Sequence, residues 1–208
     1  MSVGECKAEL APLEKSGEFK IGFAGDTFNK AWYIAQTAPD IEVGYLAAVG
    51  DDNISHDMRA FMRRSGVSGA HVSEIAGATV GLYLIHLANG ERSFSYWRGQ
   101  SAARQLATNP SDLHKAMEHA DLIYFSGITL AILDNFSRDN LLGALGRARR
   151  AGKTVALETN LRPRLWKSAT EMKSVIMRAA APSDIVLPSY DDEAEWFGDE
   201  SALATLDR

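Results

Sequence analysis

The most constraining feature of this sequence is an alternation of two patterns in its second half. From Asp112 onward, short apolar runs typical of buried strands alternate with longer segments whose apolar residues recur at helical spacing. The strand-like runs are DLIYFSG, TVALE and DIVLP, and the helical segments are DNFSRDNLLGALGRARR, SATEMKSVIMRAA and DDEAEWFG. Repeated strand–helix–strand units predict an α/β fold with a parallel sheet covered by helices on both faces.

The first half predicts the same body with an insertion. Residues up to about Ile21 predict one or two small strands, and FAGDTFNKAWYIAQ predicts a turn that runs into a helix. Val43–Gly50 is a compact apolar run, as a buried strand would be, and a helix follows it that should stop at Gly66. TVGLYLIHL and ERSFSYW, joined by Asn89 and Gly90, predict a β-hairpin inserted on the α/β body.

Composition and charge exclude several classes of function. The net charge of -5 gives no electrostatic footprint for nucleic acid, and the basic run Arg147–Lys153 is best interpreted as the solvated end of a helix. The single cysteine, Cys6, excludes an internal disulfide, and the histidines lack zinc-like spacing. There is no apolar run long enough to span a membrane and no signal pattern. We therefore expect a cytoplasmic protein without nucleic-acid or membrane partners.

The register of the hairpin brings four residues together. A two-residue turn at the Asn-Gly pair places Tyr83 opposite Tyr96, and Gly81 opposite Arg98. The two phenol rings and the guanidinium then share one face, beside the gap that Gly81 leaves. Phenol hydroxyls donate or accept, and a guanidinium binds a carboxylate through two parallel bonds. This face is either a pocket wall or a plain edge hairpin whose charges prevent aggregation.

Several phrases together resemble one family. GERSFSYWRGQSAAR resembles the lid strand of 2-keto-3-deoxygluconate kinases, and FSGITLAIL resembles their Ser-Gly-Ile loop after a central strand. ETNLRPRLW resembles their Asp-x-Asn-x-Arg-Pro-x-Leu-Trp segment, and GDTFN their Gly-Gly-Asp-x-x-Asn sugar-binding start. The phrases occur in the family's order over essentially the whole chain. The chain thus resembles ribokinase-like sugar kinases, and its Tyr-Trp-Arg and Asn-Leu-Arg-Pro pieces favour the sugar-acid branch.

This resemblance implies a fold and a reaction. The fold would be a ribokinase-like three-layer α/β sandwich with a mainly parallel sheet and a small β lid. Residues 1–208 would form an incomplete domain, with lid strands within about residues 5–22 and 78–99. The reaction would transfer the γ-phosphate of ATP to 2-keto-3-deoxygluconate, a small sugar acid, with Mg²⁺.

The resemblance also implies the residues of the site. The substrate residues would be Gly25, Asp26, Asn29, Tyr83, Tyr96, Arg98 and Arg162. The residues near the cofactor would be Asn160 and Ser189 for ATP, and Asp192 and Glu193 for water-mediated Mg²⁺ binding.

The residues themselves allow other interpretations of these positions. Asp26 could cap the helix that follows it, and Arg162 could be a surface residue before Pro163. Asp192 and Glu193 could form the acidic first turn of a helix. If the substrate assignment holds, Arg162 and the lid arginine should converge on one anion as the lid closes.

The chain departs from the family's pattern in four places. Ala24 stands where the family has a first Gly, Glu158 replaces an Asp, and Ser189 occupies the position of an Asn in an Asn-x-x-Glu motif. No Gly-Ala-Gly-Asp sequence, whose Asp would be the catalytic base, occurs in the chain. We expect the base beyond Arg208, and we expect the chain alone to bind sugar acid poorly and to transfer little phosphate.

The sequence leaves two other functions open and also allows the chain to pair with a second copy of itself. The chain could come from a ribokinase-like kinase of another sugar, or it could be a non-catalytic sugar-acid-binding or dimerisation fragment. The second hairpin face carries Leu82, Leu84 and Trp97 and is apolar enough for a homodimer to form through the lid. The same face could equally cover the chain's own core.

Overall fold

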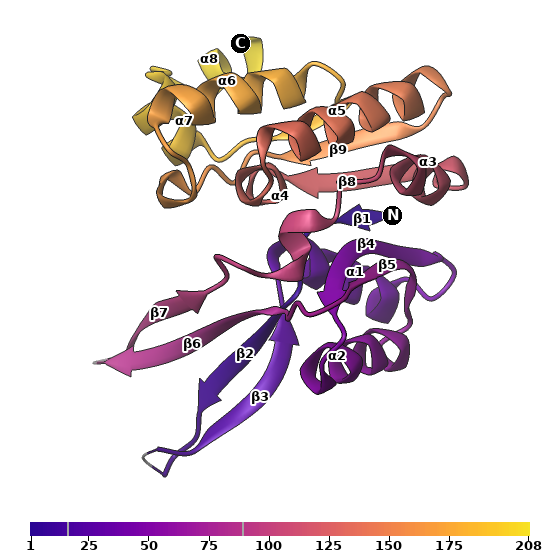
Figure 1. Cartoon of the computed structure of the whole chain (residues 1–208). Coiled ribbons are helices and arrows are strands. Elements are labelled where there is room, and N and C mark those ends of the chain that lie inside the picture. The colour runs from indigo at the N-terminus through magenta and orange to yellow at the C-terminus, as the bar shows by residue number, and fades with distance from the viewer. Residues whose placement is uncertain (16, 89) are drawn as a thin grey trace. The chain divides into compact units, whose positions relative to one another are not determined.

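The chain folds as two compact units. The computed structural model describes residues 1–15, 17–88 and 90–208. One unit comprises Ser2–Leu106, and the other comprises Ala107–Arg208 together with Met1 (Figure 1). The expectation of one incomplete domain with a lid stays a prediction.

Three parallel strands and two helices form the body of the Ser2–Leu106 unit. The strands lie in the order β1 (Ser2–Val3), β4 (Val43–Gly50) and β5 (Val67–Ile75). The helices are α1 (Asp26–Thr37) and α2 (Asn53–Arg64). All the residues of β4 except Gly44 are buried, which explains its continuous apolar run.

The core of this unit lies between its strands and helices. The rings of Phe28 and Tyr45 meet edge to face at 5.3 Å, and the Tyr45 hydroxyl hydrogen-bonds the Thr27 hydroxyl at 3.0 Å. Helix α2 ends as predicted, because Gly66 takes the left-handed φ of 74° that follows the last turn.

A second sheet in the same unit, here called the four-stranded sheet, has the order β3-β2-β6-β7. Its strands are β2 (Lys7–Pro12), β3 (Phe19–Ala24), β6 (Gly81–Ala88) and β7 (Glu91–Trp97). Figure 1 shows these strands extending away from β4 and its helices. A short 3₁₀ helix, η1 (Ala102–Gln105), follows β7.

The pairing of β6 with β7 confirms the predicted hairpin register. Tyr83 pairs with Tyr96, and Ala88 pairs with Glu91, so two residues connect the strands. Gly90 has a φ of 81°, as the turn requires, while Asn89 lies outside the described residues.

The two faces of the four-stranded sheet differ in character. At its base, Ala8 lies in the hydrophobic core of the unit, and Phe23 and Leu82 pack against that core. The opposite face, here called the polar face, carries Lys7, Glu9, Tyr83 and Tyr96, because side chains two apart on a strand share a face. Leu82 therefore covers the chain's own core, which is one of the two alternatives that the sequence left open.

The second unit confirms the predicted alternation. Its parallel strands have the order β10 (Ile185–Leu187), β9 (Thr154–Glu158) and β8 (Leu122–Ser126). Its helices are α3 (Pro110–Glu118), α4 (Gly127–Ile132), α5 (Asn135–Arg150), α6 (Ala169–Ala180), α7 (Tyr190–Phe197) and α8 (Ala202–Asp207), with a 3₁₀ turn η2 (Pro163–Leu165). Arg147, Arg149 and Arg150 occupy the last turn of α5, as predicted.

One segment differs from its expected structure. FSGITLAIL was expected to be a strand end and a loop, but Gly127–Ile132 forms helix α4. A β-carbon on Gly127 would clash with the carbonyl oxygen of Thr159, so the glycine allows the start of this helix to lie against the end of β9. Among the described residues, no helix has the length and apolar character needed to cross a membrane.

Candidate functional site

Three charged residues alternate over the start of β2 and the segment just before it. Glu5 and Lys7 are only 4% and 7% exposed, and Glu9 is half-buried. The intervening residues, Cys6 and Ala8, point into the hydrophobic core. Glu5 and Lys7 are thus charged groups held in the interior at the base of the polar face, where a charge requires compensation.

Arg98 and Glu5 form a buried ion pair. Nη2 of Arg98 contacts Oε2 of Glu5, and the two side chains are 11% and 1% exposed. The Ser101 hydroxyl donates to Oε1 of Glu5 at 2.7 Å. The gap predicted at Gly81 exists, and Glu5 fills it, because a β-carbon there would lie 2.7 Å from Oε1 of Glu5 and 3.2 Å from Cβ of Arg98. The sequence analysis expected the Arg98 guanidinium to bind a ligand carboxylate. In the structure, this guanidinium already has the Glu5 carboxylate as its partner.

The two predicted tyrosines lie side by side on the polar face. Their ring centroids are 5.9 Å apart; Tyr83 is buried, and Tyr96 is exposed. The Tyr83 hydroxyl donates a hydrogen bond to Oε2 of Glu9. Burial, and then this hydrogen bond, raises the pKa of Tyr83, so the phenol stays protonated. The sheet thus presents a tyrosine wall beside the buried charges.

Lys7 lies against this wall. Its Nζ is 5.6 Å from the centroid of the Tyr83 ring. Burial lowers the pKa of Lys7, and the nearby Glu5 carboxylate partly offsets this effect. Arg98 and Asp26 also act on this pKa, so these charges lie around one ammonium group.

The segment Gly25–Asn29 starts helix α1 beside the same charges. Gly25 is the N-cap and Asp26 the first helical residue, so Asp26 does not cap the helix. A β-carbon on Gly25 would clash with the carbonyl oxygen of Glu5, which gives this glycine a packing role. Oδ1 of Asn29 accepts a hydrogen bond from the Gly25 amide at 3.2 Å. Oδ2 of Asp26 is buried and has no hydrogen-bond partner among the described residues.

In the other unit, the Asn-Leu-Arg-Pro segment has unusual backbone geometry. Asn160 and Arg162 have positive φ values of 32° and 45°, which cost on the order of 1–3 kcal/mol each for residues other than glycine. Between them, Leu161 is buried and accepts a hydrogen bond from the Trp166 indole at 2.7 Å. The Arg138 guanidinium lies 5.0 Å from the Trp166 ring centroid and supports this anchor.

Surrounding contacts must hold these strained positions in place. Arg162 is exposed, and it belongs to a different unit from Arg98. The convergence of the two arginines on one anion therefore stays a prediction, as does the role of Asn160 near ATP.

The acidic pair near the C-terminus starts a helix. Ser189 is the N-cap of α7, and Asp192 and Glu193 lie in its first turn, as the alternative interpretation held. Glu193 is buried and pairs with the Arg208 guanidinium at 2.6 Å. No cluster of three or more metal-ligating side chains occurs within the described part of the chain. These residues do not fit a magnesium cage by themselves, and their water-mediated role stays a prediction.

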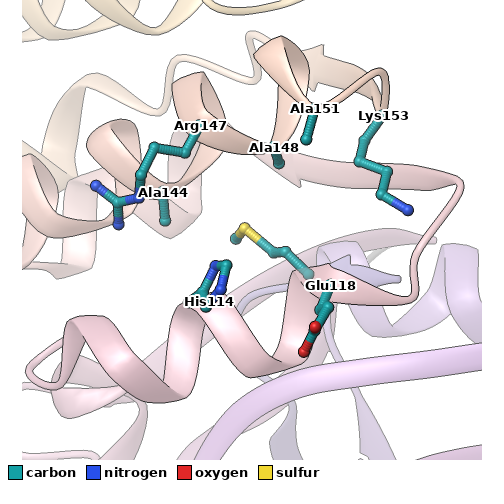
Figure 2. Close-up of a pocket in the computed structure, with 8 residues that line it drawn as sticks. His114, Glu118, Ala144, Arg147, Ala148, Ala151 and Lys153 are labelled. Carbon is teal, nitrogen blue, oxygen red and sulfur yellow. The ribbon is translucent and has the colours of Figure 1, made fainter.

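Figure 2 shows a hollow elsewhere, between helices α3 and α5. Its lining includes His114, Glu118, Arg147 and Lys153 together with apolar side chains. Its volume of about 120 Å³ is well below the ~300 Å³ at which ligand pockets begin. None of the predicted site residues lines it.

Sequence reasoning missed Glu5, Lys7 and Glu9. Their signal was present in the segment GECKAEL, where charged residues alternate with Cys6, Ala8 and Leu10. Alternation of this kind predicts a strand with one polar and one apolar face. It does not predict that Glu5 and Lys7 are buried.

Comparison with known proteins identifies the family. The model for the pfkB family of carbohydrate kinases matches residues 1–207. A 2-dehydro-3-deoxygluconokinase from Dickeya dadantii is 38% identical over 202 residues, which cover 95% of this chain and 64% of that enzyme. The sugar acid in this enzyme's name, 2-dehydro-3-deoxygluconate, is the same compound as 2-keto-3-deoxygluconate.

Solved structures confirm the fold. A 2-dehydro-3-deoxygluconokinase from Thermotoga maritima matches with a TM-score of 0.84 at 21% identity, over 99% of this chain and 65% of its own. A fructokinase from Xylella fastidiosa, solved with bound ATP, matches with a TM-score of 0.82 at 21% identity, also over 99% and 65%. The chain thus spans roughly two thirds of the length of these relatives. On the family match across nearly its whole length, the chain belongs to the pfkB family of carbohydrate kinases.

Proposed function

We propose that a protein containing this chain phosphorylates 2-keto-3-deoxygluconate. The γ-phosphate of ATP would pass to a hydroxyl of the sugar acid, with Mg²⁺ as the metal ion. The identity to the Dickeya dadantii enzyme supports this substrate. The catalytic base is expected outside the chain, since no Gly-Ala-Gly-Asp sequence occurs in it.

The observation that carries this proposal is a pair of unsatisfied buried atoms at the polar face. Nε of Arg98 and Oδ2 of Asp26 have no hydrogen-bond partner among the described residues. Each such group costs about 1–3 kcal/mol when buried unpaired. A sugar acid offers hydroxyls that donate to Asp26 and oxygens that accept from Arg98. Binding it would satisfy both atoms at once.

The remaining substrate residues have roles that suit this ligand. Tyr83 and Tyr96 would form the wall against which the carbon chain lies. Asn29 uses Oδ1 to accept from Gly25, which leaves its Nδ2 to donate to a sugar hydroxyl. Arg162, whose backbone has a φ of 45°, stays a proposed substrate residue.

The cofactor roles stay with the residues that the sequence indicated. Asn160 and Ser189 would lie near ATP. Asp192 is half-buried and would reach Mg²⁺ through water, whereas Glu193 is neutralised by Arg208. These two carboxylates form no metal cage by themselves.

One observation favours a second candidate, a kinase of a neutral sugar. The Glu5 carboxylate already compensates the charge of Arg98, so this arginine has less attraction left for a substrate carboxylate. Titration of the chain with 2-keto-3-deoxygluconate and with ribose, followed by NMR at millimolar concentrations, separates the two candidates. The proposal requires the acid to bind more tightly, and tighter binding of ribose would favour the second candidate.

We also propose a homodimer that forms through the four-stranded sheet. Strand β7 is an edge strand, and its Trp97 is 57% exposed on the face opposite the tyrosines. Light scattering at several protein concentrations tests this proposal. A dimer mass at the higher concentrations supports it, and a monomer mass throughout would end it.

The kinase activity has its own test. We would measure phosphate transfer from ATP to 2-keto-3-deoxygluconate by this chain and by a version extended through a downstream Gly-Ala-Gly-Asp sequence. The extended version should be active and the short chain nearly inactive. Full activity of the short chain would show that the base lies within it. Binding without transfer by both versions would favour a non-catalytic sugar-acid-binding module.

A further inference from the structure

Lys7 is the one buried cation of the polar face for which the described residues provide no hydrogen-bond acceptor. It is 7% exposed, and the contact found for its ammonium group is the Tyr83 ring, 5.6 Å from Nζ to the centroid. A buried ammonium with so few partners is costly for a folded protein. An anion that bound beside this group would offset that cost.

The strands beside Lys7 carry small residues opposite it. Lys7 pairs with Ala24 on β3 and with Gly81 on β6, the two smallest residue types. Large side chains at these positions would cover the lysine stem from both sides. The Glu5 and Arg98 side chains occupy the space that Gly81 leaves, so Lys7 lies beside them at the base of the tyrosine wall.

The other charges around Lys7 already have partners or suit a different group. Arg98 pairs with Glu5, whose other oxygen accepts from Ser101, and Glu9 accepts from the Tyr83 hydroxyl. Asp26 keeps one buried oxygen without a partner, which suits a ligand hydroxyl and repels a ligand carboxylate. Of the polar-face groups, Lys7 is left as the cation that can take an anion.

We infer that Lys7 determines specificity for sugar acids, with its ammonium group bound directly to the substrate carboxylate. This inference rests on the proposed function and adds a residue to its substrate site. The Glu5–Arg98 pair then acts in positioning, since Arg98 offers Nε to the ligand while Glu5 holds its guanidinium. Burial lowers the pKa of Lys7, and the nearby Glu5 carboxylate only partly offsets this effect.

A purely structural role for Lys7 predicts different behaviour. If the lysine only balanced Glu5 and Asp26, replacing it would weaken the fold and would affect acid and neutral ligands equally. The test therefore compares two ligands that differ only in charge. They are 2-keto-3-deoxygluconate and 3-deoxyfructose, in which a hydroxymethyl group replaces the carboxylate.

The experiment measures Kd for both ligands by NMR titration of the 208-residue chain. The variants are Lys7→Met, which keeps the length of the stem, and Lys7→Arg, which keeps a cation. The control is Lys20→Met, since Lys20 lies exposed on the neighbouring strand β3. A charge-assisted contact predicts that Lys7→Met weakens binding of the acid by about 10-fold or more. The same variant should change binding of the neutral ligand by less than about threefold, and Lys7→Arg should restore part of the preference.

Each result decides between the hypotheses. If Lys7→Met weakens both ligands equally, or neither, the inference is overturned, while acid binding by the unchanged chain keeps the proposed function. If neither the unchanged chain nor the version extended through a downstream Gly-Ala-Gly-Asp sequence binds the acid, the proposed function itself fails. If Lys20→Met weakens binding of the acid as much as Lys7→Met does, the effect comes from general surface charge, and the inference is overturned.

A measurement on the unchanged chain covers the case in which Lys7→Met does not fold. The ¹³Cε signal of Lys7 reports the pKa of its amine during a pH titration. Saturation with the acid should raise this pKa by about one unit or more, and saturation with 3-deoxyfructose should not. Equal pKa values with the two ligands would overturn the inference.

Discussion

Replacing Glu5 by Gln should destabilise the chain far more than an ordinary loss of charge. The substitution keeps the size of the side chain and leaves the Ser101 hydrogen bond possible, but it removes the negative charge beside Arg98. The two side chains are 1% and 11% exposed, so solvent screens this pair little. Breaking a buried ion pair on one side costs about 3–5 kcal/mol, because the other charge is left uncompensated.

This cost should appear as a large shift in melting temperature. For a chain of this size, each kcal/mol corresponds to about 2–4 °C, so Glu5→Gln should lower Tm by about 6–20 °C. Urea unfolding followed by near-ultraviolet circular dichroism gives the free energy directly. The double variant Glu5→Gln/Arg98→Met should recover most of the loss, since it no longer leaves the Arg98 charge without its partner.

A matched control lies in the same unit. Glu74 pairs with Arg59 at 3.6 Å, and their side chains are 47% and 32% exposed. Glu74→Gln should cost less than about 1 kcal/mol, as surface pairs do. The reasoning is refuted if Glu5→Gln costs no more than Glu74→Gln, or if the double variant is less stable than Glu5→Gln alone.

Three further predictions concern other parts of the molecule. Gly81→Ala should displace Glu5, because the new β-carbon would lie 2.7 Å from Oε1 of Glu5. The variant should lose about 1–3 kcal/mol of stability and bind the sugar acid more weakly. Calorimetry and NMR titration check these effects, and unchanged binding would contradict the prediction. Arg162→Met should raise the KM for 2-keto-3-deoxygluconate strongly in the extended chain while leaving Tm nearly unchanged, and an unchanged KM would remove Arg162 from the site. The hydrogen bond from Arg138 holds the pKa of Glu171 below its usual 4.5, so this pair stabilises the fold above that pH and the contribution is lost as pH falls through the lowered pKa. In Arg138→Met, the free energy of unfolding should therefore fall less steeply below about pH 5 than in the unchanged chain. Urea unfolding at several pH values measures this, and an equally steep fall would contradict the role given to the Arg138–Glu171 pair.

Much of the fold could be predicted because its elements carry strong local patterns. The strand Val43–Gly50 and the end of α2 at Gly66 follow from an apolar run and a glycine stop. Helix α4 could not be predicted in this way. It has six residues, too few to show a helical period, and its start depends on the close approach of Gly127 to Thr159, which is distant in the sequence.

The candidate site could be predicted only in part. The hairpin register placed Tyr83 and Tyr96 together because a two-residue turn fixes the pairing of its strands. The partner of Arg98 could not be found from the hairpin, since Glu5 comes from the segment before β2 and reaches the gap at Gly81 from outside the hairpin. Lys7 was missed because a lysine on a short strand is normally expected to be exposed.

The central claim is that the polar face of the four-stranded sheet binds a sugar acid. The most direct measurement is an NMR titration of the isotope-labelled chain with 2-keto-3-deoxygluconate, in which each shifted signal is assigned to its residue. The account predicts that the largest shifts occur at Lys7, Asp26, Tyr83 and Tyr96. Saturable shifts centred on His114 and Lys153 at the hollow of Figure 2, with the polar face unchanged, would contradict it.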